Sequence, residues 1–137
     1  MNRRTFLAAS GAALVFPMPV LAADRVFYTP GLAETAMESG KVVFLDFWTN
    51  WCSTCATQDR VITGLRRSNP GYDEKITFIT VDWDKYADGQ LAKDLGIPRR
   101  STLVALKGTE EIGRIIAGTG EAEIKTLLDA ALAAAMA

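Results

Sequence analysis

Cys52 and Cys55 are the residues of this 137-residue chain whose types and spacing most directly suggest chemistry. They form a Cys-x-x-Cys pattern where a strand-like run ends and a helical pattern begins. A sulfur at a helix N-terminus is stabilised as a thiolate by unpaired backbone N–H groups and by the helix dipole. Cys55 lies one turn further along, close enough to close a disulfide with Cys52. The pattern predicts dithiol–disulfide exchange, with Cys52 as nucleophile and Cys55 as resolving thiol.

The amino-acid composition excludes several other kinds of catalytic or metal site in this chain. The chain has two Cys and no His, which excludes Ser-His-Asp and Cys-His catalytic pairs and a Cys-x-x-Cys-His haem attachment. A structural zinc site normally needs four Cys or His ligands, so one chain cannot build it alone. Two alternatives stay open. One is a stapling disulfide, although so short a loop constrains the unfolded chain little, and the other is half of a soft-metal site shared between two chains.

The elements that must position the cysteines alternate between strand-like and helix-like patterns. Apolar runs predict strands, and apolar residues at helical spacing predict helices. The expected helices cover residues 32–37, 53–67, 91–95 and 121–135, and the expected strands cover residues 42–48, 76–81, 102–106 and 111–116. The last two strands are joined through Lys107-Gly108, a hairpin length and composition. This alternation predicts an α/β fold, a mixed β-sheet flanked by helices on both faces.

Length and charge favour a single globular domain, which we place at residues 24–137. The chain is 49% hydrophobic and 23% charged, values typical of compact domains. Its formal net charge is −1, and no block of five or more like charges is present. This charge pattern is not typical of proteins that bind nucleic acid, so we do not expect nucleic acid as a partner.

The N-terminal residues 1–23 have the pattern of an export signal. Arg3-Arg4 precede an apolar run without charge over residues 6–21, and the small residues Ala22 and Ala23 follow. The paired arginines resemble the twin-arginine signature of bacteria. We expect cleavage after Ala22 or Ala23 and a periplasmic mature protein. A retained membrane anchor is the alternative, which the shortness of the run disfavours.

The segment from Leu45 to Cys55 resembles the thioredoxin family, because it combines Asp46, Trp51 and the cysteine pair at a strand-to-helix corner. The resemblance continues along almost the whole mature chain. It implies a thioredoxin-like fold and a monomeric thiol:disulfide oxidoreductase that exchanges with protein thiols and disulfides and needs no cofactor. The chain is most similar to small periplasmic reductants and to the terminal thioredoxin domain of the transmembrane electron conduit. A membrane electron donor of that conduit type is therefore an expected partner.

Asp46 interrupts an otherwise apolar strand pattern. An unpaired charge in such a place is costly, and a raised carboxyl pKa is the expected response. The resemblance implies that Asp46 exchanges a proton with Cys55 during release of the mixed disulfide. An Asp that sits at the strand end and reaches solvent is the alternative. The family often has a Lys near this acid on the neighbouring strand, and Thr80 occupies the matching position here.

The loop opposite the cysteines departs from the family, which has Ile, a cis Pro and Thr before a strand. The residues here are Arg99-Arg100-Ser101-Thr102. Alignment of the strand through Thr102 puts Ser101 at the proline position. The other alignment, with Ile97-Pro98 as the cis dipeptide, would bury two unpaired charges in a central strand. We favour Ser101, with a trans bond before it because a cis bond to a non-proline residue costs about 2.5–4 kcal/mol.

Three residues are expected to bind substrate beside the sulfurs. Trp51 shields the disulfide rather than packing in the core. By resemblance, Arg100 takes the position whose backbone pairs with an extended substrate, and its charge would lower the pKa of Cys52. Ser101 completes this group, and we expect Ser101→Pro to bring the loop toward the family shape.

The direction of electron flow is not readable from Ser53-Thr54, the two residues between the cysteines. By resemblance we favour a reductant. A disulfide oxidant and a non-enzymatic module that binds a soft metal such as Cu(I) through both thiolates are the alternatives.

Overall fold

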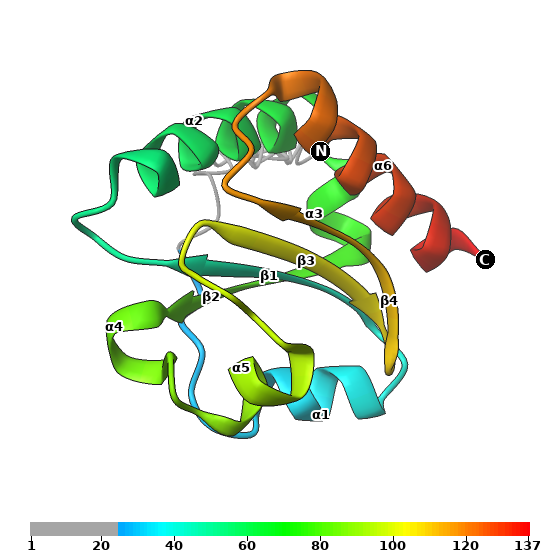
Figure 1. Cartoon of the computed structure of the whole chain (residues 1–137). Coiled ribbons are helices and arrows are strands. Elements are labelled where there is room, and N and C mark those ends of the chain that lie inside the picture. Colours follow the sequence, from blue (N-terminus) through cyan, green and yellow to red (C-terminus); the bar gives the residue numbers. More distant parts are fainter. Residues whose placement is uncertain (1–24) are drawn as a thin grey trace, which may run out of the picture.

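The computed structural model describes residues 25–137 (Figure 1). The predicted signal peptide and its cleavage site lie outside the described residues. Within residues 25–137, no helix is both long enough and apolar enough to cross a bilayer.

A four-stranded mixed sheet forms the centre of the molecule. Its strands are β1 (Val42–Trp48), β2 (Ile76–Asp82), β3 (Thr102–Lys107) and β4 (Glu110–Ile116). They are arranged in the order β2-β1-β3-β4, with β1 parallel to β2 and antiparallel to β3. β3 and β4 form the predicted antiparallel hairpin. The predicted fold class is confirmed.

Helices cover both faces of this sheet (Figure 1). On one face lie α2 (Ser53–Ser68), α3 (Gly71–Lys75) and α6 (Glu121–Met136), and on the other lie α1 (Leu32–Glu38), α4 (Trp83–Tyr86) and α5 (Gln90–Leu95). The four helices expected from periodicity are present at these places. α3 and α4 are additional, and both are too short to show a repeat in the sequence.

Strand β1 is buried on both faces, which explains its uninterrupted apolar run. Val42 and Phe44 pack in the core layer under α2 and α6, whereas Leu45 and Phe47 pack in the layer with α1 and α5. Full burial of such a side chain stabilises the fold by about 1.5–3 kcal/mol. The strand that ends at the cysteine loop is therefore held from both sides.

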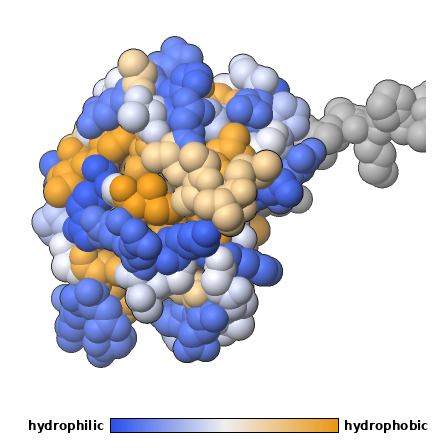
Figure 2. All heavy atoms as spheres, turned by 90° about the vertical axis from the view of Figure 1, so that its right-hand side faces the viewer, coloured by the Kyte–Doolittle hydropathy of each residue, from blue (hydrophilic) through white to orange (hydrophobic). Residues whose placement is uncertain are grey.

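Figure 2 shows the face on which α6 ends, at the right of Figure 1 and away from the start of α2. Hydrophobic residues gather at the centre of this face, and hydrophilic residues surround them. Ala134 and Ala135, near the end of α6, are partly buried against the core.

Candidate active site

The cysteine pair lies where β1 leads into α2. Cys52 is the N-cap residue of α2, and its sulfur accepts a hydrogen bond from the backbone N–H of Cys55 at 3.1 Å. Cys52 is 6% exposed and Cys55 is fully buried. Both are free thiols. The first sulfur thus occupies the helix N-terminus that the spacing predicted, and the second lies behind it in the protein.

Hydrogen bonds at Cys52 favour its thiolate. Burial alone would raise the pKa of this thiol, but hydrogen bonds from the Cys55 thiol, the Ser101 hydroxyl, the Cys55 backbone N–H and Arg100 outweigh it. The pKa of Cys52 is lowered to about 7 as a result. About half of Cys52 is then ionised at neutral pH.

The environment of Cys55 acts in the opposite direction. Burial, and then its hydrogen bond to Cys52, raise the pKa of Cys55 above that of an ordinary thiol, although the Ser101 hydroxyl opposes them. Cys55 therefore stays protonated while Cys52 is reactive, and it needs a proton acceptor before it can attack.

Ser101 lies directly against both sulfurs. Its Oγ is 3.1 Å from the Sγ of Cys52 and 3.1 Å from the Sγ of Cys55. Its backbone is left-handed, with φ of +64°, and no peptide bond in residues 25–137 is cis. A serine thus faces the pair at the position that the family resemblance assigns to proline.

The left-handed backbone of Ser101 is held by three hydrogen bonds. Its N–H donates to the carbonyl of Phe47 at 2.6 Å. Its carbonyl accepts from the N–H of Ala117 at 2.9 Å and from Nε2 of Gln58 at 3.0 Å. Proline has no N–H and a φ near −65°, so Ser101→Pro does not fit this loop. Ser101→Pro therefore cannot keep the present backbone of the loop, and the expectation that it brings the loop toward the family shape stays a prediction.

Trp51 and Arg100 form the outer wall of the site. Trp51 is 59% exposed, so it does not pack in the core. Its Nε1 donates to Oδ2 of Asp84 in α4 at 2.8 Å, and the Arg100 guanidinium lies 4.4 Å from the centre of its ring. Arg99 instead turns its Nε to the carbonyl of Arg100. Of the two arginines, Arg100 is the one that lowers the pKa of Cys52.

Asp46 lies inside β1, paired with Thr80 of β2 and Leu103 of β3, and is 7% exposed. It does not sit at a strand end open to solvent. Burial above all, and then the negative charge of Asp59, raise the pKa of Asp46 well above its ordinary range, whereas the Arg25 cation opposes them. Asp46 is thus a buried carboxyl group that takes up a proton more readily than an ordinary aspartate.

Sequence reasoning missed three residues that belong to this region. Gln58 is fully buried, and its amide holds the carbonyls of Ser101 and Gly118. Asp59 and Arg25 lie beside Asp46. Gln58 and Asp59 follow the cysteines on α2, but a polar residue on a helix gives no sign of which loop it contacts. Arg25 comes from the start of the described chain, where the sequence carries no motif.

The described side chains around the cysteines differ from the ligand sets that usually hold metal ions. Within residues 25–137, no three side chains of the His, Cys, Asp or Glu types are grouped to hold a metal ion. The two sulfurs and the Ser101 hydroxyl form a compact set suited to thiol–disulfide exchange.

Comparison with known proteins agrees with this geometry. A family model described as "Thioredoxin" matches residues 30–130. "Thioredoxin" of Echinococcus granulosus is 29% identical over 97 residues, which cover 71% of this chain and 84% of the relative. "Thiol:disulfide interchange protein DsbE" of Pasteurella multocida is 26% identical over 116 residues, 83% of this chain and 61% of the relative.

Among solved structures, Trxlp from Edwardsiella tarda EIB202 has a TM-score of 0.65 and 23% identity, and the match covers 75% of this chain and 97% of that one. This likeness shows the fold.

Proposed function

The chain belongs to the thioredoxin family and is a thiol:disulfide oxidoreductase, and from this we propose that it acts as an exported reductant of protein disulfides in the periplasm. The observation that carries the chemistry is the asymmetry of the two sulfurs. One accepts hydrogen bonds at a helix N-terminus, and the other is buried behind it.

The first step uses the Cys52 thiolate. It attacks one sulfur of a substrate disulfide, a bond forms between Cys52 and that sulfur, and the other substrate sulfur leaves as a thiolate that takes up a proton. The low pKa of Cys52 supplies the nucleophile near neutral pH.

The second step releases the substrate. Cys55 gives its proton to the Asp46 carboxylate, and the new thiolate attacks the sulfur of Cys52. A disulfide forms between Cys52 and Cys55 as the bond from Cys52 to the substrate breaks. The substrate sulfur leaves as a thiolate that takes up a proton, so both substrate sulfurs are now reduced. The protein is oxidised by two electrons, and a further thiol donor must restore the dithiol.

Substrate binding is assigned to the wall around Cys52. The exposed Trp51 ring offers an apolar surface, and the Arg100 guanidinium stacked on it offers positive charge. The Ser101 hydroxyl is near enough to donate to either sulfur as charge moves between them. An extended segment with an acidic side chain beside its disulfide fits this surface.

Support for export and for the reducing direction comes from the sequence. Arg3-Arg4 and the uncharged apolar run after them are typical of a twin-arginine signal. A reductant in an oxidising compartment needs electrons, and a membrane donor of the transmembrane thiol-reductant conduit type would supply them. We further propose that the protein acts as a monomer.

The reduction potential of the Cys52/Cys55 pair tests the proposed direction. Equilibration with glutathione, read by thiol labelling, should give a potential near the −270 mV of thioredoxin. A potential near −120 mV would make the protein an oxidant. Metal analysis of the protein as isolated tests the Cu(I) alternative, because stoichiometric copper on both thiolates would contradict the redox role.

Trapping experiments separate the roles of the two cysteines. Cys55→Ala should accumulate mixed disulfides through Cys52, visible as bands that disappear on reduction. Cys52→Ala is the matched control and should trap nothing. Equal trapping by both variants would contradict the assignment of nucleophile and resolving thiol.

A further inference from the structure

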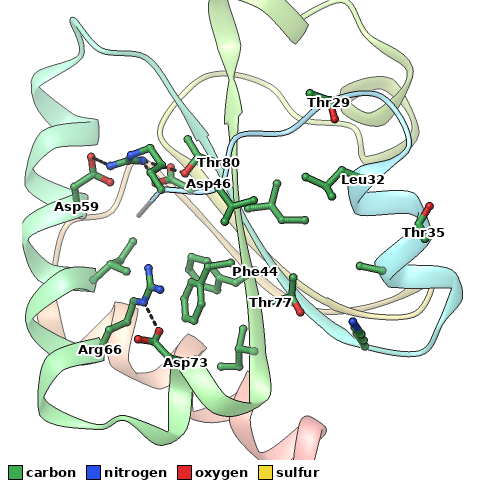
Figure 3. Close-up of a pocket in the computed structure, with 18 of the residues that line it drawn as sticks. Thr29, Leu32, Thr35, Phe44, Asp46, Asp59, Arg66, Asp73, Thr77 and Thr80 are labelled. Carbon is green, nitrogen blue, oxygen red and sulfur yellow. Dashed lines mark hydrogen bonds and ion pairs between the residues drawn. The ribbon is translucent and has the colours of Figure 1, made fainter. Parts of the chain in front are cut away.

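The guanidinium of Arg25 joins three elements around Asp46. Figure 3 labels the three residues that it contacts, Asp46, Asp59 and Thr80. Its Nη2 is 2.7 Å from Oδ2 of Asp59 in α2, and its Nη1 donates to Oγ1 of Thr80 in β2 at 3.0 Å. Nη1 also lies 3.7 Å from Oδ2 of Asp46 in β1. One cation therefore contacts two carboxylates, and Asp59 is its closer partner.

The Asp59 carboxylate is fixed in this arrangement from a second side. Its Oδ2 accepts a hydrogen bond from Nε1 of Trp48 at 3.0 Å, and the Arg25 guanidinium lies 4.6 Å from the centre of the Trp48 ring. Asp59 is also four residues after Cys55 on α2, so both side chains lie on one face of that helix. The helix that carries the resolving thiol thus also carries a second acid toward Asp46.

Water has access to this cluster. Arg25, Asp46 and Asp59 line an open cavity of about 1050 Å³ beside β2. That volume holds many waters, since one water takes about 30 Å³ of liquid. Oδ1 of Asp46 is buried and has no hydrogen-bond partner within residues 25–137, whereas Oδ2 of the same carboxyl group faces the Arg25 guanidinium.

Arg25 is not needed to hold its own segment on the sheet. The N–H of Tyr28 donates to the carbonyl of Thr80 at 2.7 Å, and the N–H of Thr80 donates to the carbonyl of Val26 at 2.8 Å. These backbone bonds attach the segment without the Arg25 side chain. Attachment of the segment therefore does not explain why the Arg25 side chain contacts two carboxylates.

We propose that Arg25 and Asp59 are positioning residues that set when Asp46 takes and releases its proton, with the cavity beside β2 as the route to solvent. This inference rests on the proposed role of Asp46 in the release of substrate. The proton passes from the Cys55 thiol to the Asp46 carboxylate, and from there to water in the cavity next to Asp59. No electrons move in this transfer.

The charges that face Asp46 explain opposite effects of the two residues. Arg25 from the N-terminal segment favours the ionised carboxylate, and Asp59 from α2 disfavours it. Cys52, when ionised, also disfavours it. The paired positions on the neighbouring strands, Thr80 and Leu103, carry no charge.

The test is an NMR titration of the reduced mature protein in which the carboxyl carbons of the aspartates are labelled. The chemical shift of the Asp46 carboxyl carbon, followed against pH, gives its pKa. Arg25→Gln should raise the pKa of Asp46, and Asp59→Asn should lower it, each by about one unit, as expected for a charge within 4–6 Å. Arg25→Lys keeps the charge and should return the pKa toward the wild-type value.

Arg66→Gln is the matched control. Arg66 also pairs with an aspartate, Asp73, and lies over an aromatic ring, Phe78, in the same cavity. Figure 3 shows the Arg66–Asp73 pair at a distance from Asp46. The Asp46 pKa should be unchanged in this variant. Equal pKa values of Asp46 in wild type, Arg25→Gln and Asp59→Asn would overturn the proposal, as would shifts in the same direction.

A kinetic measurement connects the titration to the reaction. The release of substrate from the mixed disulfide should show a pH midpoint that moves upward in Arg25→Gln and downward in Asp59→Asn. Unmoved midpoints would overturn the link to substrate release. The titration does not require activity, so it separates this inference from the proposed function. If the pKa of Asp46 shifts in opposite directions in the two variants but the wild-type protein does not reduce a model disulfide, the proposed function is contradicted and the effect of Arg25 and Asp59 on Asp46 is still supported.

Discussion

At the residue scale, two thiols three positions apart have opposite acid–base behaviour. Burial opposes ionisation of both, but only Cys52 accepts the N–H of Cys55 at the start of α2 and a contact from Arg100. The hydrogen bond between the two sulfurs lowers the pKa of one and raises that of the other. The position of each sulfur relative to the helix N-terminus therefore decides its role.

Alkylation of the reduced protein should follow ionisation of Cys52. Because its pKa is about 7, the rate of reaction with iodoacetamide should rise through a midpoint near pH 7 rather than near 9. Arg100→Gln should move the midpoint upward by about half a unit, because a nearby cation favours the thiolate. Arg99→Gln is the matched control, since its exposed side chain turns to a backbone carbonyl. Equal shifts in the two variants would contradict the assignment of Arg100.

The buried Asp46 should make the stability of the fold depend on pH. Its pKa in the folded protein is raised above the ordinary value of 3.8, so its contribution is fully present below pH 3.8 and is lost as pH rises toward the folded pKa. Each unit of separation is worth about 1.4 kcal/mol. Asp46→Asn should remove this decline, so its advantage in free energy of unfolding over wild type should grow between acid and neutral pH.

Urea unfolding of both proteins across this pH range gives the measurement. If the difference in free energy of unfolding between Asp46→Asn and wild type stayed constant with pH, Asp46 would have the same pKa in the folded and the unfolded protein, which would contradict the prediction. The variant should also slow the reduction of a model disulfide, because Cys55 then lacks its proton acceptor.

At the scale of the elements, the loop before β3 is shaped by its neighbours rather than by its own residues. Ser101 has a φ of +64°, a conformation that costs a non-glycine residue about 1–2 kcal/mol. Bonds to Phe47, Ala117 and Gln58 hold it there, and the hydroxyl consequently reaches both sulfurs. β1, α2 and the segment after β4 together determine this loop.

Two substitutions of Ser101 should therefore behave differently. Ser101→Ala keeps the backbone bonds and should fold normally, but it should raise the pKa of Cys52 because a donor to its thiolate is lost. Ser101→Pro loses the bond to Phe47 and cannot adopt the left-handed backbone, so it should lower the free energy of unfolding by about 3 kcal/mol. Thermal unfolding and thiol titration measure the two effects. A Ser101→Pro protein as stable as wild type would contradict the account of this loop.

At the scale of the whole molecule, one sheet brings the cysteine corner, the Ser101 loop and the Arg25 cluster to one end of β1. The central strand β1 carries Asp46 and ends at the cysteine loop. On one side β2 places Thr80 beside Asp46, and on the other side Ser101 comes directly before β3. Expected cleavage after Ala22 or Ala23 leaves Arg25 in the mature chain. Export would therefore deliver the complete cluster.

Export itself can be tested in a bacterium with a twin-arginine pathway. The wild-type protein should appear in the periplasm with an N-terminus at Ala23 or Asp24, as measured by mass spectrometry of the fractionated cells. Substitution of Arg3-Arg4 by two lysines should leave the precursor in the cytoplasm. Periplasmic protein in undiminished amount from the lysine variant would contradict the twin-arginine route.

The sequence by itself determined the elements and the reactive pair. Apolar runs and helical periodicity are local patterns, and they predicted all four strands, the longer helices and the place of Cys52 at a helix start. The acid inside an apolar strand also marked Asp46 before any contact was known. Short helices such as α4 gave no signal, because they make barely one turn.

Only the tertiary structure decided how the site is tuned. Arg25 and Thr80 are 55 positions apart and Gln58 and Ser101 are 43 apart, and no local pattern in the sequence reports such contacts. The left-handed Ser101 runs against the intrinsic preference of its residue type, and bonds from three other parts of the chain impose it. The sulfur environment is thus a property of packing, because it depends on hydrogen bonds and charges that only the folded sheet brings within reach.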